Sequence, residues 1–143
     1  MNSDGCKYLI FSLSGELFAL ELSQVAEVCE PQPLWPVPAA PSYYRGAMNF
    51  HGAVVVVMVL AEFMGLTVDS KMEKLIVLHE SIAALAFLVE RVIRIVPAAQ
   101  VELLEGGERP FASGTVVISE GKARLLDARV ITDQATERVN STS

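Results

Sequence analysis

Residues 43–66, YYRGAMNFHGAVVVVMVLAEFMGL, contain the longest continuous apolar run of the chain. Gly46 and Gly52 bracket a short strand-like piece, residues 47–51. The β-branched run Ala53–Val59 follows, and a run of this kind predicts a strand that is buried on both faces. Such a strand belongs in the middle of a core, so this segment is the expected centre of the fold.

Length and composition indicate one globular domain. The 143 residues are enough to bury a core without disulfides or metal ions. Hydrophobic residues make up 52% of the chain and charged residues 20%, which excludes a disordered chain and predicts an interaction-prone surface. The formal net charge of −6 argues against nucleic acid or an anionic membrane as a partner, because both require a basic surface. Most of the acidic excess falls within residues 1–70, either as solvated carboxylates or as a docking surface for a basic partner.

The sequence predicts a cytoplasmic protein that does not insert into a membrane. No apolar run approaches the ~20 residues that a transmembrane helix needs. Ser14, Gly15 and Glu16 interrupt the first apolar run, so the N-terminal region lacks the apolar core of a signal peptide. Cys6 and Cys29 fit no metal-binding pattern, and we expect two free thiols rather than a disulfide.

Apolar runs of strand length follow one another along the chain and are separated by turn residues. The predicted strands are residues 7–13, 16–22, 25–30, 47–51, 53–59, 73–79, 82–89, 92–96, 111–119 and 122–126. Ser14 and Gly15 predict a tight hairpin between the first two strands. Ser23 predicts the N-cap of a single helical turn after the second strand.

Two connections between the strands have a marked composition. Five prolines between Pro31 and Pro41 predict a rigid, extended connector. Trp35 within it is interpreted as a lid over a core edge, with an exposed recognition residue as the alternative. Residues 101–110 include three glutamates and two glycines, and we expect a polar loop there.

Helical structure is expected in only two places. Residues 60–65 predict a helical turn that ends at Gly65, and a short helix is expected from Asp127. Residues 1–6 are expected to form a polar lead-in and residues 136–143 a loose tail.

The chain repeats its own plan. The pairs that superpose are residues 7–11 with 74–78, 17–20 with 84–87 and Val25 with Val92 at an offset of 67, Gly46 with Gly114 at 68, and Gly52 with Gly121 at 69. The repeat predicts two small β subdomains, at about residues 7–66 and 74–130, that pack on one shared core, because a half of this size is marginally stable alone. Chance similarity among strand-rich segments is the alternative. The cleft between the halves would be a natural binding place.

No local motif indicates catalysis. The sequence has no Walker loop, GxGxxG, GxSxG or CxxC pattern, so we expect no enzyme activity, cofactor or metal. A triad of distant residues would leave no local signature. His79 is expected at a hairpin edge. His51 should point outward if Phe50 points inward, either as a plain surface residue or as a contact residue.

Three stretches of the chain resemble the chemotaxis coupling protein family, the CheW-like domains. They are YLIFSLSGELFALELSQVAEV (8–28), VPAAPSYYRGAMNFHGAVVVVMVL (37–60) and PFASGTVVISEGKARLLD (110–127), and together they place nearly the whole chain within the resemblance. The resemblance implies an all-β fold with short helices: two small five-stranded β-barrel-like (SH3-like) subdomains that share a core in a single domain, residues 7–135.

The resemblance also implies a function. Members of the family are non-enzymatic adaptors that couple the cytoplasmic tips of methyl-accepting chemoreceptors to the regulatory domain of a CheA-type histidine kinase. The family's V-x-E strand falls on Val25 and Glu27, and its G-x-x-N-L-R-G turn begins at Gly46. The residues implied to bind protein partners are Val25, Glu27, Gly46, Asn49, His51 and Gly52.

Two departures from the family pattern leave the partner open. His51 stands where the family has arginine, and an imidazole titrates near pH 6.5 whereas a guanidinium stays charged. Val56 and Val59 stand where the family's P-V-V-D-L exit has proline and aspartate. The alternative is therefore a diverged module that has lost receptor coupling and binds another protein, or a small ligand between its halves. Weak self-association is also left open.

Overall fold

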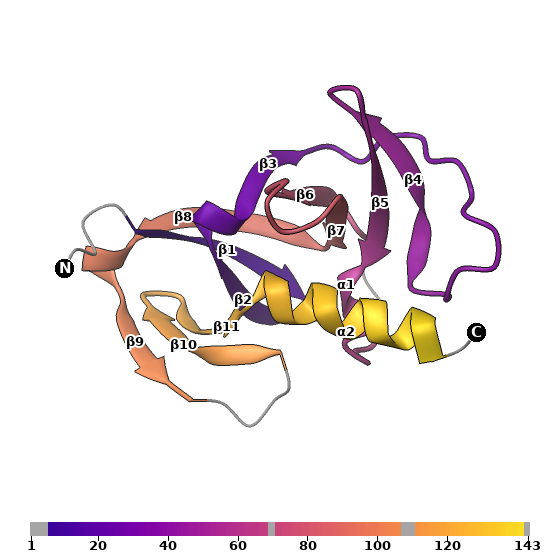
Figure 1. Cartoon of the computed structure of the whole chain (residues 1–143). Coiled ribbons are helices and arrows are strands. Elements are labelled where there is room, and N and C mark those ends of the chain that lie inside the picture. Colours follow the sequence, from indigo (N-terminus) through magenta and orange to yellow (C-terminus); the bar gives the residue numbers. More distant parts are fainter. Residues whose placement is uncertain (1–5, 69–70, 107–110, 142–143) are drawn as a thin grey trace.

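The computed structural model describes residues 6–68, 71–106 and 111–141 and consists of two β-sheets with short helical elements (Figure 1). The strands are β1 (Lys7–Leu13), β2 (Glu16–Glu21), β3 (Val25–Cys29), β4 (Tyr44–Phe50), β5 (Ala53–Val59), β6 (Lys74–Leu78), β7 (Leu85–Val89), β8 (Arg91–Pro97), β9 (Glu102–Glu105), β10 (Ala112–Ile118) and β11 (Gly121–Leu126). The helices are α1 (Leu60–Phe63) and α2 (Ala128–Ser141), with 3-10 turns at Leu22–Gln24 and Ala98–Gln100.

The strands form one six-stranded and one five-stranded sheet. Their orders are β8-β1-β2-β11-β10-β9 and β3-β6-β7-β5-β4. Neighbouring strands are antiparallel except for two parallel pairs, β11 with β2 and β5 with β7. The predicted mainly-β fold is confirmed, although one sheet has six strands where five were expected.

The repeat is present in the order of elements, but its halves exchange their hairpins. The β1–β2 hairpin lies in the sheet of β8, β10 and β11, and the β6–β7 hairpin lies in the sheet of β3, β4 and β5. Neither sheet therefore corresponds to one of the predicted contiguous halves, 7–66 and 74–130. The physical reason is the parallel pairing, because parallel neighbours cannot be joined by a tight turn and each hairpin finds its parallel partner in the other half.

Register shows that the two sheets are equivalent. Val56 is paired with Leu85 across β5 and β7, and Arg124 is paired with Phe18 across β11 and β2. The offsets, 85 − 18 = 67 and 124 − 56 = 68, are those of the sequence repeat. The repeat in the sequence is thus also a repeat of strand pairing.

One hydrophobic cluster joins the two sheets. Phe11 and Phe18 of the six-stranded sheet belong to the same buried cluster as Phe87 of the five-stranded sheet and Ile131 of α2. Each such side chain contributes about 1.5–3 kcal/mol on burial. The expectation of a shared core is confirmed.

The central run Ala53–Val59 is buried on both faces only in its second half. Val57 and Val59 belong to a cluster inside the five-stranded sheet, whereas Met58, between them, faces the shared core. Val54 is 59% exposed, so the prediction of a fully buried strand was wrong for the start of β5. That end of the strand projects into the β4–β5 turn.

Gly46 and Gly114, equivalent in the repeat, allow a neighbouring backbone to approach closely. A Cβ at Gly46 would lie 2.7 Å from the Trp35 carbonyl oxygen, and one at Gly114 would lie 2.6 Å from that of Leu104. Trp35 forms a β-bridge with Ala47, and Leu104 belongs to β9. Trp35 is 47% exposed, so its interpretation as a lid was wrong.

Strand β9 corrects the expectation of a polar loop over residues 101–110. Its ELLE segment pairs with β10 at the edge of the six-stranded sheet, where all four side chains are exposed. A strand that buries neither face has no apolar periodicity and cannot be found from the pattern. Residues 107–110 lie outside the described residues.

Helix α2 is longer than expected. Residues 136–141 belong to it, so the prediction of a loose tail from residue 136 was wrong; residues 142–143, and residues 1–5 of the predicted lead-in, lie outside the described residues. Ala128, Ile131 and Ala135 are buried at helical spacing and hold the helix on the shared core. Within the described chain no helix has the length and apolar character needed to cross a membrane.

The two helices begin differently. Asp127 caps α2, because its Oδ1 accepts hydrogen bonds from the Arg129 N–H at 2.9 Å and the Gln24 side chain at 3.2 Å. Val59, the equivalent residue before α1, provides no side-chain cap. The predicted cap Ser23 lies inside the 3-10 turn at Leu22–Gln24, which has no side-chain cap hydrogen bond.

Asp127→Ala removes the cap of α2. We expect the free energy of unfolding to fall by about 1 kcal/mol, because the first turn loses its hydrogen-bond acceptor. Urea denaturation followed by circular dichroism measures this. Asp127→Asn is the control and should keep most of the stability, since asparagine caps helices equally well. Equal losses in both variants would contradict the capping role.

Candidate functional site

The β4–β5 turn and strand β3 bring together four of the six predicted residues. His51 Nε2 lies 3.3 Å from Glu27 Oε1, and the Gly52 N–H donates a hydrogen bond to Asn49 Oδ1 at 3.0 Å. His51 and Gly52 are the two turn residues between paired Phe50 and Ala53, and both have left-handed backbones, with φ of 49° and 86°. A two-residue hairpin turn of this type requires positive φ at both positions.

The contact between Glu27 and His51 spans the two edges of the five-stranded sheet. Strand β3 is one edge of that sheet, and the β4–β5 turn adjoins the other edge, β4. A contact between them requires the sheet to curl round on itself, as a barrel-like subdomain does. The pair is hereafter called the Glu27–His51 clasp.

The clasp is open to solvent. The side chains of His51 and Glu27 are 74% and 45% exposed, so the expectation that His51 points outward is confirmed. The His51 ring lies 4.3 Å from the Phe50 ring between centroids. Val54, paired with Asn49 beside the turn, is among the most exposed large apolar side chains described. An acid and an imidazole therefore meet at this turn, and an exposed valine lies near the start of the strand that follows it.

The other two predicted residues do not join this surface. Gly46 is buried against the backbone of Trp35. Val25 begins β3 opposite Leu78 and packs against the shared core. Their positions support the strands that carry the clasp.

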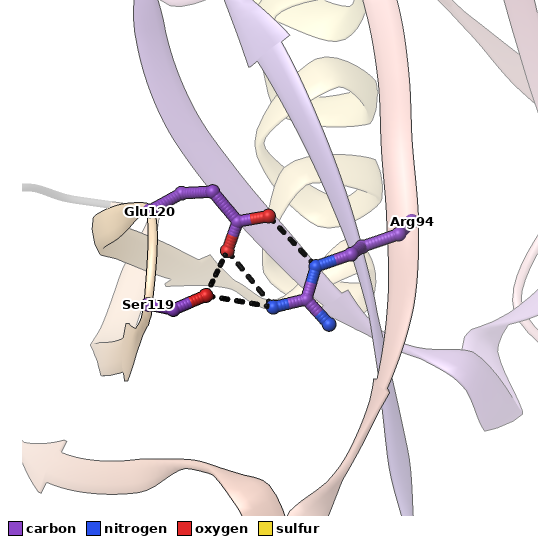
Figure 2. Close-up of polar contacts among 3 residues, drawn as sticks. All are labelled: Arg94, Ser119 and Glu120. Carbon is purple, nitrogen blue, oxygen red and sulfur yellow. Dashed lines mark hydrogen bonds and ion pairs between the residues drawn. The ribbon is translucent and has the colours of Figure 1, made fainter.

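In the six-stranded sheet, an ion pair joins the edge strand β8 to the β10–β11 turn (Figure 2). Arg94 on β8 donates two hydrogen bonds to Glu120 in the β10–β11 turn, from Nε at 2.7 Å and from Nη2 at 2.8 Å. Ser119 Oγ donates to Glu120 Oε1 at 2.9 Å and accepts from Arg94 Nη2 at 3.3 Å. The bonds from Arg94, then from Ser119, lower the pKa of Glu120 from its ordinary 4.5 to about 2.

This Arg94–Glu120 clasp is equivalent to the Glu27–His51 clasp with the acidic and the basic residue exchanged. The strand residues are offset by 94 − 27 = 67 and the turn residues by 120 − 51 = 69, as in the repeat. In the first half the acid is on the strand, and in the second half it is on the turn. The sequence prediction missed Arg94, Ser119 and Glu120, although extending the repeat to charged residues would have found them.

The described residues do not assemble a metal site. Among them, no group of three or more histidine, cysteine, aspartate or glutamate side chains could hold a metal ion. His79 instead accepts a hydrogen bond at Nδ1 from the Ser81 N–H at 3.1 Å, next to the hairpin end where it was expected. Cys6 and Cys29 are both free and partly buried.

Comparison with known proteins relates the chain to one family. The model of the CheW-like domain matches residues 7–136. A chemotaxis protein CheW of Thermotoga maritima is 27% identical over 96 residues, which cover 66% of this chain and 64% of that protein. A chemotaxis protein CheW of Treponema pallidum is 24% identical over 106 residues, covering 70% and 62%. The match thus spans less than two thirds of the length of these relatives.

The fold is also found among solved structures. The scaffolding protein TtCheW from Thermoanaerobacter tengcongensis has a TM-score of 0.72 against this chain at 22% identity. The superposition covers 85% of this chain and 88% of that protein. At this identity the likeness establishes the fold.

Arg94→Met should return the pKa of Glu120 from about 2 toward its ordinary 4.5, because the carboxylate loses both hydrogen bonds from the guanidinium. A carboxyl whose pKa is lowered by folding stabilises the fold above its ordinary pKa, and the contribution is lost as the pH falls through about 2. Carbon-detected NMR titration of the side-chain carboxyl measures the shift. Arg91→Met, on the same strand, is the control and should leave Glu120 unchanged. An unchanged pKa in Arg94→Met would contradict the clasp.

Proposed function

Because this chain belongs to the family of CheW-like domains, we propose that it is an adaptor that couples chemoreceptors to a CheA-type histidine kinase through protein contacts alone. Scaffolding proteins of this family are not enzymes. The proposed partners are the cytoplasmic tip of a methyl-accepting chemoreceptor and the regulatory domain of the kinase. The proposed domain is residues 7–135, and the proposed location is the cytoplasm.

The observation that carries the proposal is the exposed Glu27–His51 clasp. Its residues fall on the two family motifs, the V-x-E strand and the G-x-x-N turn, which are far apart in sequence and meet at one edge of the molecule. An exposed ion pair contributes only about 0–1 kcal/mol to folding. A partner can therefore engage these groups at small cost to the fold.

The composition of this edge fits a protein interface. Protein interfaces combine an apolar centre with a polar rim. Val54 supplies exposed apolar surface beside the turn, while Glu27 and His51 supply the polar rim. The chain's net charge of −6 favours a partner whose docking surface is basic.

His51 sets the strength of this contact. An arginine at this position would offer five N–H donors in a fixed fork, whereas the imidazole makes one contact with Glu27 at 3.3 Å. Glu27 therefore keeps acceptor capacity for a donor of the partner. An arginine at this position would pair with Glu27 more completely, whereas His51 leaves part of the Glu27 carboxylate available to a partner.

His51→Arg should change the affinity for a receptor tip or for a kinase regulatory domain about threefold to tenfold, because the guanidinium competes for Glu27 and adds a permanent positive charge. Isothermal titration calorimetry with each partner measures this. His79→Arg, at a turn outside the clasp, is the matched control. Identical affinities for wild type and His51→Arg would remove His51 from the interface.

Glu27→Lys should weaken binding about tenfold, because it reverses the charge presented at the edge. The melting temperature should stay nearly unchanged, since the pair is exposed. Glu80→Lys, an equal charge change at an exposed residue of the β6–β7 turn, is the control. A collapsed melting temperature would make Glu27 a structural residue, and failure of wild type to bind any kinase regulatory domain or receptor tip would favour the diverged module.

A further inference from the structure

A groove with a cavity volume of about 630 Å³ lies where the proline-rich connector, the five-stranded sheet and α2 meet. Connector residues 37–41 line it together with Tyr44, Val56 and Leu85 of the sheet and Thr132 and Ala135 of α2, among others. Figure 1 shows the connector and α2 approaching each other beside β4 and β5. The groove is separate from the Glu27–His51 clasp, none of whose residues line it.

The lining is electrically neutral. None of the described residues that line the groove is charged, although charged side chains make up 20% of the chain. Charged ligands would lose hydration on entering without gaining a partner, so the lining complements an uncharged molecule.

Two polar side chains of the lining, both on α2, can accept a hydrogen bond from a ligand. Thr132 Oγ1 donates to the Ala128 carbonyl at 2.8 Å, and Thr136 Oγ1 donates to the Thr132 carbonyl at 3.0 Å. These hydroxyls use their protons within the helix and keep lone pairs for a ligand. Pro38 in the connector has no N–H. Tyr44 is the side chain of the lining that can donate, and burial raises the pKa of its phenol, which keeps the proton in place.

The repeat provides an internal comparison. Val56 and Arg124 are equivalent, as are Ala83 and Glu16, at offsets of 124 − 56 = 68 and 83 − 16 = 67. In the six-stranded sheet Arg124 forms an ion pair with Glu16 at 2.9 Å and lies 5.7 Å from the centre of the Phe18 ring. A recess is present at that surface too, and Glu16 and Arg124 are among the residues that line it, so its lining is charged. Valine and alanine stand at the equivalent positions of the groove, so its neutrality is a property of these residues rather than of the fold.

A departure from the family pattern lies in the wall of the groove. Val56 stands where the family's exit motif has proline, and its N–H donates to the Ala84 carbonyl at 3.1 Å. Proline could not make this bond. The substitution therefore adds a hydrogen bond between β5 and the start of β7, and it places a branched apolar side chain in the lining.

The size of the groove fits a small molecule. Thirteen of the described residues line it, fewer than the roughly 20–30 per side of a stable protein interface. Its volume lies within the range of about 300–1,000 Å³ that is typical of small-molecule sites. Ala83 and Ala135 contribute little side-chain bulk, which leaves space for a ligand between the larger side chains of the lining.

We propose that this groove binds a neutral, predominantly aromatic small molecule that carries a single hydrogen-bond donor. The ring would lie among Tyr44, Val56 and Leu85, and the donor would meet the threonine hydroxyls of α2 or a connector carbonyl. The site does not depend on the coupling function, because it uses none of the clasp residues.

Indole is the probe, and indole-3-carboxylate is its charged counterpart. Titration of the full chain with each, followed by amide chemical shifts in two-dimensional NMR, should give saturable shifts with indole at groove residues. At least tenfold weaker binding is expected for the carboxylate. Thr136→Phe should fill the groove and weaken indole binding at least tenfold, whereas Glu137→Phe, the adjacent exposed residue of α2 outside the lining, should leave it unchanged. Thermal melts check that both variants fold.

Three results would overturn the proposal: no saturable shift with indole, equal indole affinity for both phenylalanine variants, or equal affinity for the neutral and charged probes. Loss of kinase or receptor binding by Thr136→Phe, without indole binding by wild type, would instead assign the groove to a protein partner. A second variant, Ala84→Asp, places a carboxylate at an exposed position of the lining and should also abolish indole binding. Retained binding in this folded variant would likewise contradict a neutral site.

Discussion

In each sheet, one strand of a hairpin from one half of the chain pairs in parallel with a strand from the other half. Four strand pairings join the two halves by backbone hydrogen bonds: the parallel pairs β2–β11 and β5–β7, and the antiparallel pairs β1–β8 and β3–β6. Because of this exchange, neither half can complete its sheet without the other, and the apolar faces of both sheets close on one core. The exchange also carries α2, which follows β11 directly, onto that core and thereby forms one side of the groove.

Curling of the sheets brings the residues of each clasp together. Each sheet has a clasp from an edge strand to a hairpin turn, with the acidic residue on the strand in one clasp and on the turn in the other. The Arg94–Glu120 clasp is bidentate and short, and it includes Ser119, so it holds its turn firmly. The Glu27–His51 clasp is a single, longer contact between more exposed groups. At equivalent positions of the fold, the Arg94–Glu120 clasp thus fixes its hairpin turn, whereas the Glu27–His51 clasp is more accessible to solvent.

Much of the fold could be predicted because its strands are apolar runs of characteristic length between turn residues. The hairpin at Ser14 and Gly15 and the turn at Gly52 follow from residue types that tolerate positive φ. Strand β9 could not be found, since a strand exposed on both faces has no pattern. The length of α2 was missed because its buried residues, such as Ala128 and Ala135, are small and sparse, and its second half is polar.

Within the candidate site, Glu27, Asn49, His51 and Gly52 were predicted from the family motifs, whereas the residues that line the groove were not.

The sequence by itself determined the order of the elements, their repeat and the residues of the β4–β5 turn, because these depend on periodicity and backbone preference over a few neighbouring residues. Only the tertiary structure decided which hairpin completes which sheet, and therefore that Glu27 meets His51 and Arg94 meets Glu120. It also decided that Val37, Val56 and Thr132 surround one groove. The physical reason is that strand pairing is set by the burial of both halves in a common core, and that burial is a property of the whole chain and not of any segment.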